Sequence, residues 1–183
     1  AKGTNEEAYL VQKLVRTGFG TNNVDHCTRL CHASSVAALL ENIGSGAVTA
    51  SFAECRNAEA IIVIGANPTV NHPVAATFIK NAAQRGARLY ILDPRGQHLD
   101  RYATESLRFS PGSDVAMLNA MINVIITEEL YDADYVAKQT EGFEDLKART
   151  AHTTPEAMAP ICGVDADTLR RVARGYATAG SAM

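Results

Sequence analysis

The sequence lacks several features that would assign it to a class of protein directly. It has no excess of positive charge, since 17 lysine and arginine residues stand against 20 aspartate and glutamate residues and the net charge is −3. Charge therefore gives no reason to expect binding to nucleic acid or to an anionic membrane. The apolar runs are far shorter than the ~20 residues of a membrane-spanning helix. No signal-peptide pattern is visible, and we expect a cytoplasmic protein.

Cysteine is sparse, and its spacing does not indicate a disulfide framework. The four cysteines stand at positions 27, 31, 55 and 162, whereas disulfide-stapled domains are small and dense in cysteine. Cys27 and Cys31 form a C-x3-C pair, which is a weak zinc signal without a second pair of ligands. No internal repeat is present, and 183 residues of which 46% are hydrophobic suffice for one ordinary domain with a core.

Cysteine and histidine are concentrated between Asp25 and Ser35, where two of the four cysteines and two of the five histidines lie. One helical segment ends and another begins in this stretch. Amide dipoles at a helix start favour a thiolate, and a neighbouring histidine exchanges protons near neutral pH. Cys31-His32 is therefore a candidate soft ligand or nucleophile beside an acid–base group. The alternative is that Cys31 is a buried, small apolar side chain.

The remaining pattern predicts an α/β protein, an αβα sandwich with a mainly parallel, Rossmann-like sheet and flanking helices. Continuous apolar runs at residues 60–64 and 88–92 are typical of strands buried on both faces, and residues 105–109 form a third, more exposed candidate strand. A helix over 73–84 would join the first two strands as a right-handed βαβ unit. Spacing and capping residues predict further helices over 4–17, 36–42, 52–57, 115–127, 132–140, 143–150 and 166–179, and one that begins at Thr154.

Three loops should meet at one edge of this sheet. Residues 65–68, 93–96 and 110–114 follow the three strands, and open α/β sheets bind ligands beyond the carboxyl ends of their strands. Glycine-containing turns approach phosphate closely, Arg95 could pair with a phosphate, and Asp93 or Asp114 could accept hydrogen bonds from a ribose or a guanine. The standard NAD fingerprint G-x-G-x-x-G is missing. The loops indicate a nucleotide site, the alternative being ordinary turns.

Five motifs in fixed order carry a family resemblance. They are Thr21-Asn-Asn-Val-Asp25, Cys31-His32, Ile64-Gly-Ala-Asn-Pro68 with Asn71-His72-Pro73, Leu92-Asp-Pro-Arg95, and Gly112-Ser-Asp114. Over essentially its whole length the chain resembles the molybdopterin-dependent oxidoreductases, and within them the catalytic (alpha) subunit of NAD-linked formate dehydrogenase. The resemblance implies oxidation of formate to carbon dioxide, with the release of two electrons and one proton.

The resemblance also implies roles for individual residues. Cys31 would ligate molybdenum or tungsten, and His32 beside it would handle the proton or steer formate. Related nitrate reductases usually have Met at that next position, so His32 favours formate, although Ala33-Ser34 replaces a Gly-Pro pair of some relatives. The loops would hold one molybdopterin guanine dinucleotide of a bis-pterin centre, with His72 bracing them, and the cofactor-binding candidates are Gly65, Asn67, Asp93, Arg95, Gly112 and Asp114.

A longer parent protein follows from the same resemblance. An iron–sulfur cluster segment should precede residue 1, and a second pterin site and a catalytic arginine should lie beyond Met183. We therefore expect an internal fragment, inactive alone, in which residues 1–26 are a helical segment of a neighbouring domain and residues 27–183 form the αβα domain. The implied partners are formate, the other domains of the parent and NAD-linked electron-transfer subunits, without nucleic acid or a membrane segment.

Three other functions stay open at this point. The parent could be a nitrate or other oxyanion reductase of the same superfamily, or the chain could be a non-catalytic nucleotide-binding module in which Cys31 only packs. Substrate assays and Cys31→Ser in the parent would separate these two from a formate dehydrogenase. A redox switch would need Cys27 and Cys31 to be exposed and close, which thiol labelling with and without oxidant would reveal.

Overall fold

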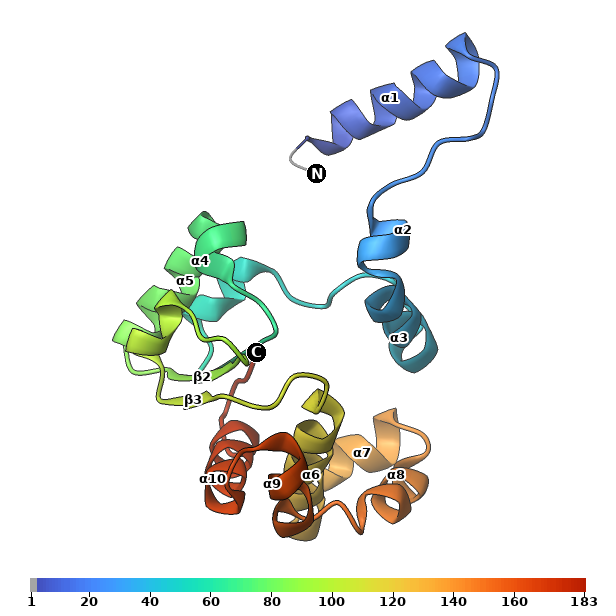
Figure 1. Cartoon of the computed structure of the whole chain (residues 1–183). Helices are drawn as coiled ribbons and strands as arrows, with labels where there is room; N and C mark the ends of the chain where they lie inside the picture. Colours follow the sequence, from blue (N-terminus) through green and yellow to red (C-terminus); the bar gives the residue numbers. More distant parts are fainter. Residues whose placement is uncertain (1–2) are drawn as a thin grey trace. The chain divides into compact units, whose positions relative to one another are not determined.

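The computed structural model of the protein describes residues 3–183, which divide into two compact units, residues 3–50 and residues 51–183 (Figure 1). The first unit holds α1 (Asn5–Gly18), α2 (Thr28–Cys31) and α3 (Ala33–Ile43), and none of these helices has a buried residue. The expected boundary after residue 26 concerns the domains of a longer protein and stays a prediction. Residues 1 and 2 of that expected segment lie outside the described residues.

The second unit contains a parallel sheet in the order β1-β2-β3, which confirms the predicted α/β class. Among the helices that the structure describes, none is long and apolar enough to cross a membrane. In chain order the elements of this unit are η1 (Phe52–Arg56), β1 (Ala60–Ile64), α4 (Pro68–Asn71), α5 (Pro73–Gln84), β2 (Arg88–Leu92), η2 (His98–Tyr102), β3 (Glu105–Leu107), α6 (Asp114–Thr127), α7 (Ala133–Gln139), α8 (Phe143–Thr150), α9 (Pro155–Cys162) and α10 (Ala166–Ala177), where η denotes a 3-10 helix.

Helices cover both faces of this sheet (Figure 1). Side chains alternate between the two faces along a strand, so β2 directs Leu89 and Ile91 to one face and Tyr90 and Leu92 to the other. The first pair packs in a cluster with residues of η1, α5 and η2, and the second pair in a cluster with residues of α6, α9 and α10. Burial on both faces explains why the strand reads as one unbroken apolar run.

The last residues of the chain extend the sheet beyond β1. Ala182 forms a parallel bridge with Ala60. Met183 donates its N–H to the carbonyl of Ala60 at 2.9 Å, and Ile62 donates to the carbonyl of Met183 at 2.8 Å. The free edge of β1 is therefore covered along its first three residues, which leaves β3 as the opposite edge of the sheet.

Four helices, α1, α7, α9 and α10, begin at capping residues that the sequence predicts, whereas the expected side-chain caps of η1 and α6 are not formed. Thr4 and Glu7 form a reciprocal capping box at α1, with the N–H of Thr4 2.7 Å from Glu7 Oε2 and the N–H of Glu7 3.2 Å from Thr4 Oγ1. Asp132, Thr154 and Asp165 cap α7, α9 and α10 through their side-chain oxygens. Three short elements, α2, α4 and η2, are not predicted, because a single turn shows no apolar period. β3 ends at residue 107 and α10 at residue 177, two residues earlier than expected.

An ion pair ties the end of α6 to α10. Arg174 donates from Nε to Glu128 Oε2 at 2.7 Å and from Nη2 to Oε1 at 2.8 Å, and these hydrogen bonds hold the pKa of Glu128 below its usual value. A lowered folded-state pKa stabilises the fold above the unfolded pKa, and that stabilisation is lost as the pH falls through the folded value. We expect Glu128→Gln to lower the free energy of unfolding at neutral pH by at most about 1 kcal/mol, because the pair is half exposed and screened.

Urea unfolding at a series of pH values tests this prediction. The difference between wild type and Glu128→Gln should vanish in acid, where Glu128 is protonated in both the folded and the unfolded state. Glu141→Gln, at an exposed carboxylate near the start of α8, should match wild type throughout. If the effect of Glu128→Gln on the free energy of unfolding does not change with pH, the charge of Glu128 does not contribute to stability.

Candidate functional site

The three strands end at the same level of the sheet. Ile64, the last residue of β1, is in register with Leu92, the last residue of β2, which in turn pairs with Leu107 at the end of β3. Because all three strands are parallel, the segments that follow them begin at one edge. This is the edge at which open α/β sheets bind ligands, so the residues around it form the candidate site of the second unit.

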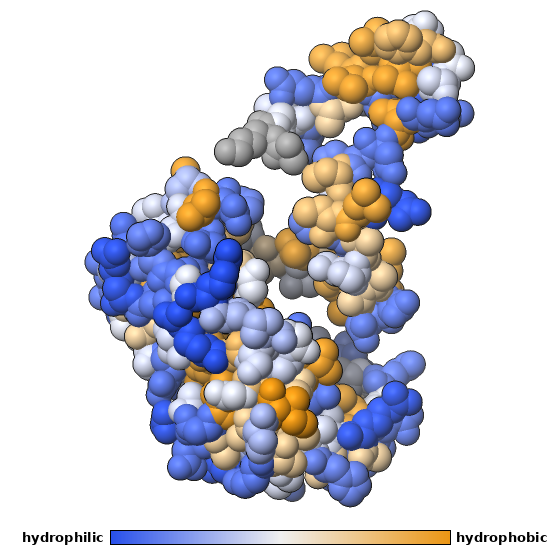
Figure 2. Space-filling view, viewed as in Figure 1, coloured by the Kyte–Doolittle hydropathy of each residue, from blue (hydrophilic) through white to orange (hydrophobic). Residues whose placement is uncertain are grey.

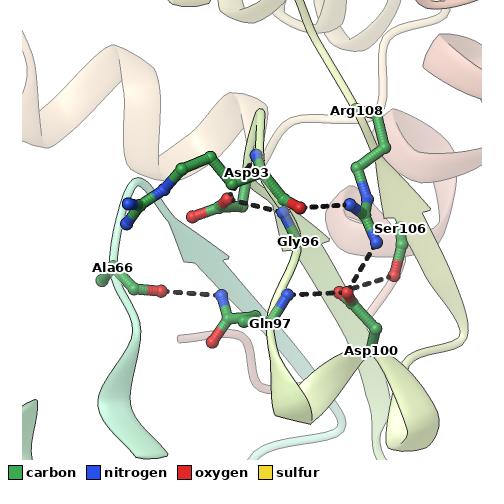
Figure 3. Close-up of polar contacts among 8 residues, drawn as sticks. Ala66, Asp93, Gly96, Gln97, Asp100, Ser106 and Arg108 are labelled. Carbon is green, nitrogen blue, oxygen red and sulfur yellow. Dashed lines mark hydrogen bonds and ion pairs between the residues drawn. The ribbon is translucent and has the colours of Figure 1, made fainter. Parts of the chain in front are cut away.

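Asp93 shapes the loop after β2 from within. Its side chain is buried, and Oδ1 accepts the backbone N–H groups of Arg95 at 2.8 Å and of Gly96 at 2.9 Å (Figure 3). Two charge-assisted hydrogen bonds of this kind fix a tight turn. The carboxylate is thus engaged by its own loop, and its role is to position Arg95 and Gly96. Both hydrogen bonds use Oδ1, so Oδ2 stays available to accept a hydrogen bond from a ribose or a guanine, the other role considered for Asp93.

Arg108, which follows β3, braces the same loop from the other side. Its Nη1 donates to the carbonyl of Arg95 at 2.7 Å, and its Nη2 donates to Asp100 Oδ2 at 2.8 Å. Ser106 Oγ donates to Asp100 Oδ1 at 3.1 Å, as Figure 3 shows. The loop after β2 is therefore fixed to β3 and to η2 by a connected set of polar side chains. Sequence reasoning missed Arg108, Asp100 and Ser106 entirely.

Gln97 connects the loops that follow β1 and β2. Its Nε2 donates to the carbonyl of Ala66 at 2.7 Å, and its backbone N–H donates to Asp100 Oδ2 at 2.8 Å (Figure 3). Gln97 Oε1 is buried and has no hydrogen-bond partner among the described residues. A buried acceptor without a donor is costly, so this oxygen is an available contact for a ligand N–H or O–H group. The capping-box spacing of Gln97 and Asp100 was the one sequence signal that could have identified them.

A groove of about 540 Å³ opens between these loops. Of the residues predicted from the sequence, Asn67 lines it, Gly65 directly follows β1, and Asp93 and Arg95 form the adjoining turn. Gly112 and Asp114 follow β3 farther along, at the start of α6, and do not line the groove. The residues that do line it are Asn67, Val70, Gly96, Gln97, His98, Asp100, Arg101 and Arg108, so its wall is mostly polar and carries two guanidinium groups.

Cys31 and His32 lie in the first unit, at the junction of α2 and α3. Cys31 is the last residue of α2, and its N–H donates to the carbonyl of Cys27 at 2.8 Å. His32 is the N-cap residue of α3 and accepts the N–H of Val36 at 2.8 Å. Cys31-His32 thus lies where one helix ends and another begins, as expected, but the short helix α2 that precedes α3 was not predicted. The difference arises because the single turn of α2 has no apolar period that the sequence could reveal.

Both thiols of this stretch are accessible. Cys27 and Cys31 are free and exposed, whereas Cys55 and Cys162 are buried in the second unit. In residues 3–183, no three His, Cys, Asp or Glu side chains lie close enough together to hold a metal ion. A metal bound by Cys31 would therefore take its other ligands from outside these residues. A single exposed thiolate beside an imidazole suits a metal that another group already holds.

The chain is similar over nearly all of its length to known formate dehydrogenases. Formate dehydrogenase H of Escherichia coli (strain K12) is 43% identical over 183 residues, which are 100% of this chain and 26% of that protein. The F420-dependent formate dehydrogenase subunit alpha of Methanocaldococcus jannaschii is 41% identical over 179 residues, 98% of this chain and 27% of that protein. The chain thus spans about a quarter of the length of these curated relatives.

A solved structure and a family model agree with these similarities. Acetylene Hydratase from Pelobacter acetylenicus superposes with a TM-score of 0.75 and 32% sequence identity, over 85% of this chain and 21% of that chain. The family model "Molybdopterin oxidoreductase" matches residues 2–171, nearly the whole sequence. With the parallel sheet, the polar groove at its carboxyl edge and the exposed Cys31-His32 pair, these matches show that the chain belongs to the molybdopterin oxidoreductase family.

Proposed function

We propose that the longer protein of which this chain forms part is a formate dehydrogenase, which oxidises formate to carbon dioxide. The observation that carries the proposal is the exposed Cys31-His32 pair, in a chain that aligns from end to end with a formate dehydrogenase. A bound molybdenum or tungsten bis-pterin centre would supply the acceptor for the two electrons. The thiolate of Cys31 would hold the metal, and the imidazole of His32, the next residue, would accept or orient the proton that formate releases.

The second unit would hold one molybdopterin guanine dinucleotide. Its groove fits such a group on two counts: the guanidinium of Arg101 can pair with phosphate oxygens, while that of Arg108 holds the loop, and the unpartnered Gln97 Oε1 can accept an N–H of a guanine. The backbone of Gly65 and Gly112 would face the phosphates, since the space beside both residues is open and a Cβ built at either meets no atom within 4 Å. Asn67, Arg95 and Asp114 would supply side-chain contacts, and Asp93 would act by positioning the turn that carries Arg95.

The rest of the catalytic apparatus would lie outside these residues. Electrons would leave through the pterin and iron–sulfur clusters towards NAD, with the cluster segment, the second pterin site and the electron-transfer subunits contributed by other parts of the enzyme. The 183-residue chain alone would not oxidise formate, because residues 3–183 hold no cluster of three His, Cys, Asp or Glu side chains that could bind the metal without the rest of the enzyme.

The dinucleotide part of the proposal is tested with Arg95→Ala in the longer protein. Loss of a charge-assisted phosphate contact should weaken the affinity for the nucleotide about tenfold. Less guanine nucleotide should therefore stay bound through purification. The nucleotide is measured after acid release from the purified protein, together with molybdenum and tungsten. Arg149→Ala, at an exposed position in the last turn of α8, is the matched control and should retain both. Full retention of nucleotide by Arg95→Ala would show that Arg95 does not bind the nucleotide.

A further inference from the structure

A second concave region lies at the amino-terminal edge of the sheet, away from the candidate cofactor groove. Arg56 ends η1, just before β1, and Arg85 follows α5, just before β2. Two cavities of about 620 Å³ and 190 Å³ open here, and both are lined by Arg56 and Arg85. We call this pair of cavities the amino-edge groove. The two arginines therefore stand between its larger and its smaller part.

The two guanidinium groups are held in place by their surroundings. The guanidinium carbon of Arg56 lies 5.2 Å from the centroid of the Phe78 ring, a cation–π contact. Arg85 Nη2 donates to the carbonyl oxygen of Arg56 at 3.5 Å, which links the two residues. Asn81, on the exposed side of α5, adds an amide to the wall of the smaller cavity. Preorganised donors of this kind lose little conformational entropy when a ligand binds.

Neither guanidinium has a counter-ion in the part of the chain that the structure describes. The ion pairs within 4.0 Å involve Arg108, Arg170, Arg171, Arg174 and Lys138, and neither Arg56 nor Arg85 is among them. Glu59 lines the larger cavity, but its Oε2 accepts the N–H of Gly180 at 2.9 Å and so faces the end of the chain. Two positive charges on one groove attract an anion, which would supply the counter-ion that neither guanidinium has among the described residues.

We propose that the amino-edge groove binds an acidic peptide segment of a partner protein, with carboxylate side chains paired to Arg56 and Arg85. The planar fork of a guanidinium matches a carboxylate with two parallel hydrogen bonds. An inorganic ion, only a few times the ~30 Å³ of a water molecule, would fill a small part of either cavity, whereas an extended peptide can occupy the space on both sides of the arginine pair. The proposal is independent of the formate dehydrogenase assignment, because it involves the opposite edge of the sheet.

The test uses the longer protein of which this chain forms part and a fluorescein-labelled peptide of alternating glutamate and aspartate, followed by fluorescence anisotropy at low salt. Wild type should bind, and Arg56→Gln and Arg85→Gln should each raise Kd about tenfold, the loss of one charge-assisted pair. Added salt should weaken binding, because the pairs are exposed. Arg149→Gln is the control for general charge and should leave Kd unchanged. A lysine peptide of the same length should not bind.

Lysine variants of the two arginines and competition with inorganic phosphate can each contradict the proposal. Arg56→Lys and Arg85→Lys keep the charge but lose the fork, so they should bind with intermediate affinity, and a urea midpoint equal to that of wild type shows that they are folded. Peptide binding that survives Arg85→Gln and Arg85→Lys unchanged would overturn the proposal. So would displacement of the peptide by inorganic phosphate at the same concentration as by unlabelled peptide, since that result describes a small-anion site.

Discussion

Gly96→Ala is expected to lower the free energy of unfolding of the second unit by about 1–2 kcal/mol, the sum of backbone strain and the loss of a half-exposed ion pair. Gly96 has φ +83°, a conformation that alanine adopts only with strain, and a Cβ there would overlap the guanidinium of Arg108. Arg108 would have to leave, and its hydrogen bonds to the carbonyl of Arg95 and to Asp100 would be lost. The effect should be seen as a lower midpoint of urea unfolding with an unchanged slope.

Gly112→Ala separates backbone strain from the loss of Arg108. Gly112 has nearly the same φ, +84°, but a Cβ there meets no atom within 4 Å. This variant should therefore show only the strain, roughly 1 kcal/mol. Equal destabilisation by the two substitutions would mean that Arg108 does not brace the loop after β2. In the longer protein, Gly96→Ala should also reduce retention of guanine nucleotide, because Gly96 lines the groove.

Cys31→Ser in the longer protein is expected to reduce formate oxidation by more than about a hundredfold, beyond the range typical of outer-shell changes at metal sites. A serine hydroxyl is a poor substitute for a thiolate as a soft metal ligand. The dinucleotide groove is built from other residues in the second unit, so retention of guanine nucleotide should change much less than turnover. Arg95→Ala should show the opposite pattern, with the loss of bound guanine nucleotide as its primary effect.

Cys27→Ser is the matched control for Cys31→Ser. Both thiols are exposed and four residues apart at the two ends of α2, so a general effect of thiol loss on this stretch would appear in both variants. We expect the Cys27 variant to keep its activity. Equal loss in both variants would instead indicate a function of the cysteine pair, such as the redox switch that the C-x3-C spacing left open.

An apolar surface on the first unit bears on how the chain behaves in solution. Tyr9, Leu10, Val11 and Leu14 of α1 are each more than half exposed, and Figure 2 shows the hydrophobic colouring over this helix. Contiguous apolar surface of this kind is found where another part of a protein packs. Studies of the isolated chain should therefore check self-association before binding constants are interpreted.

The sheet was predictable because its signals are local. The runs 60–64 and 88–92 are apolar at every position or nearly so, since helices cover both faces, and the helix from Pro73 carries its own start signal in the fixed φ of proline. The alignment of the strand ends follows from parallel pairing, so the position of Gly65 and Asp93 at one edge could be inferred without coordinates.

The hydrogen bonds that shape the site were less predictable, because they join residues that are far apart in the sequence. Arg108 reaches back 13 residues to Arg95, and Gln97 reaches 31 residues to Ala66. No periodicity encodes such pairs. Asp93 was predicted as a cofactor-binding residue, which stays a prediction, but only the structure shows that its Oδ1 also holds the loop after β2. The short helix α2 was missed for a related reason, since a single helical turn leaves no pattern in the sequence.

The most direct test of the central claim is a combined measurement on the longer, purified wild-type protein: its molybdenum and tungsten content, and its reduction of an artificial electron acceptor in the presence of formate. We expect about one metal atom for each Cys31 side chain and formate-dependent reduction of the acceptor. Metal with nitrate reduction and no formate oxidation would contradict the substrate assignment. A protein that carries neither metal, while its groove still binds guanine nucleotide, would contradict the role of Cys31 and leave only a nucleotide-binding α/β unit.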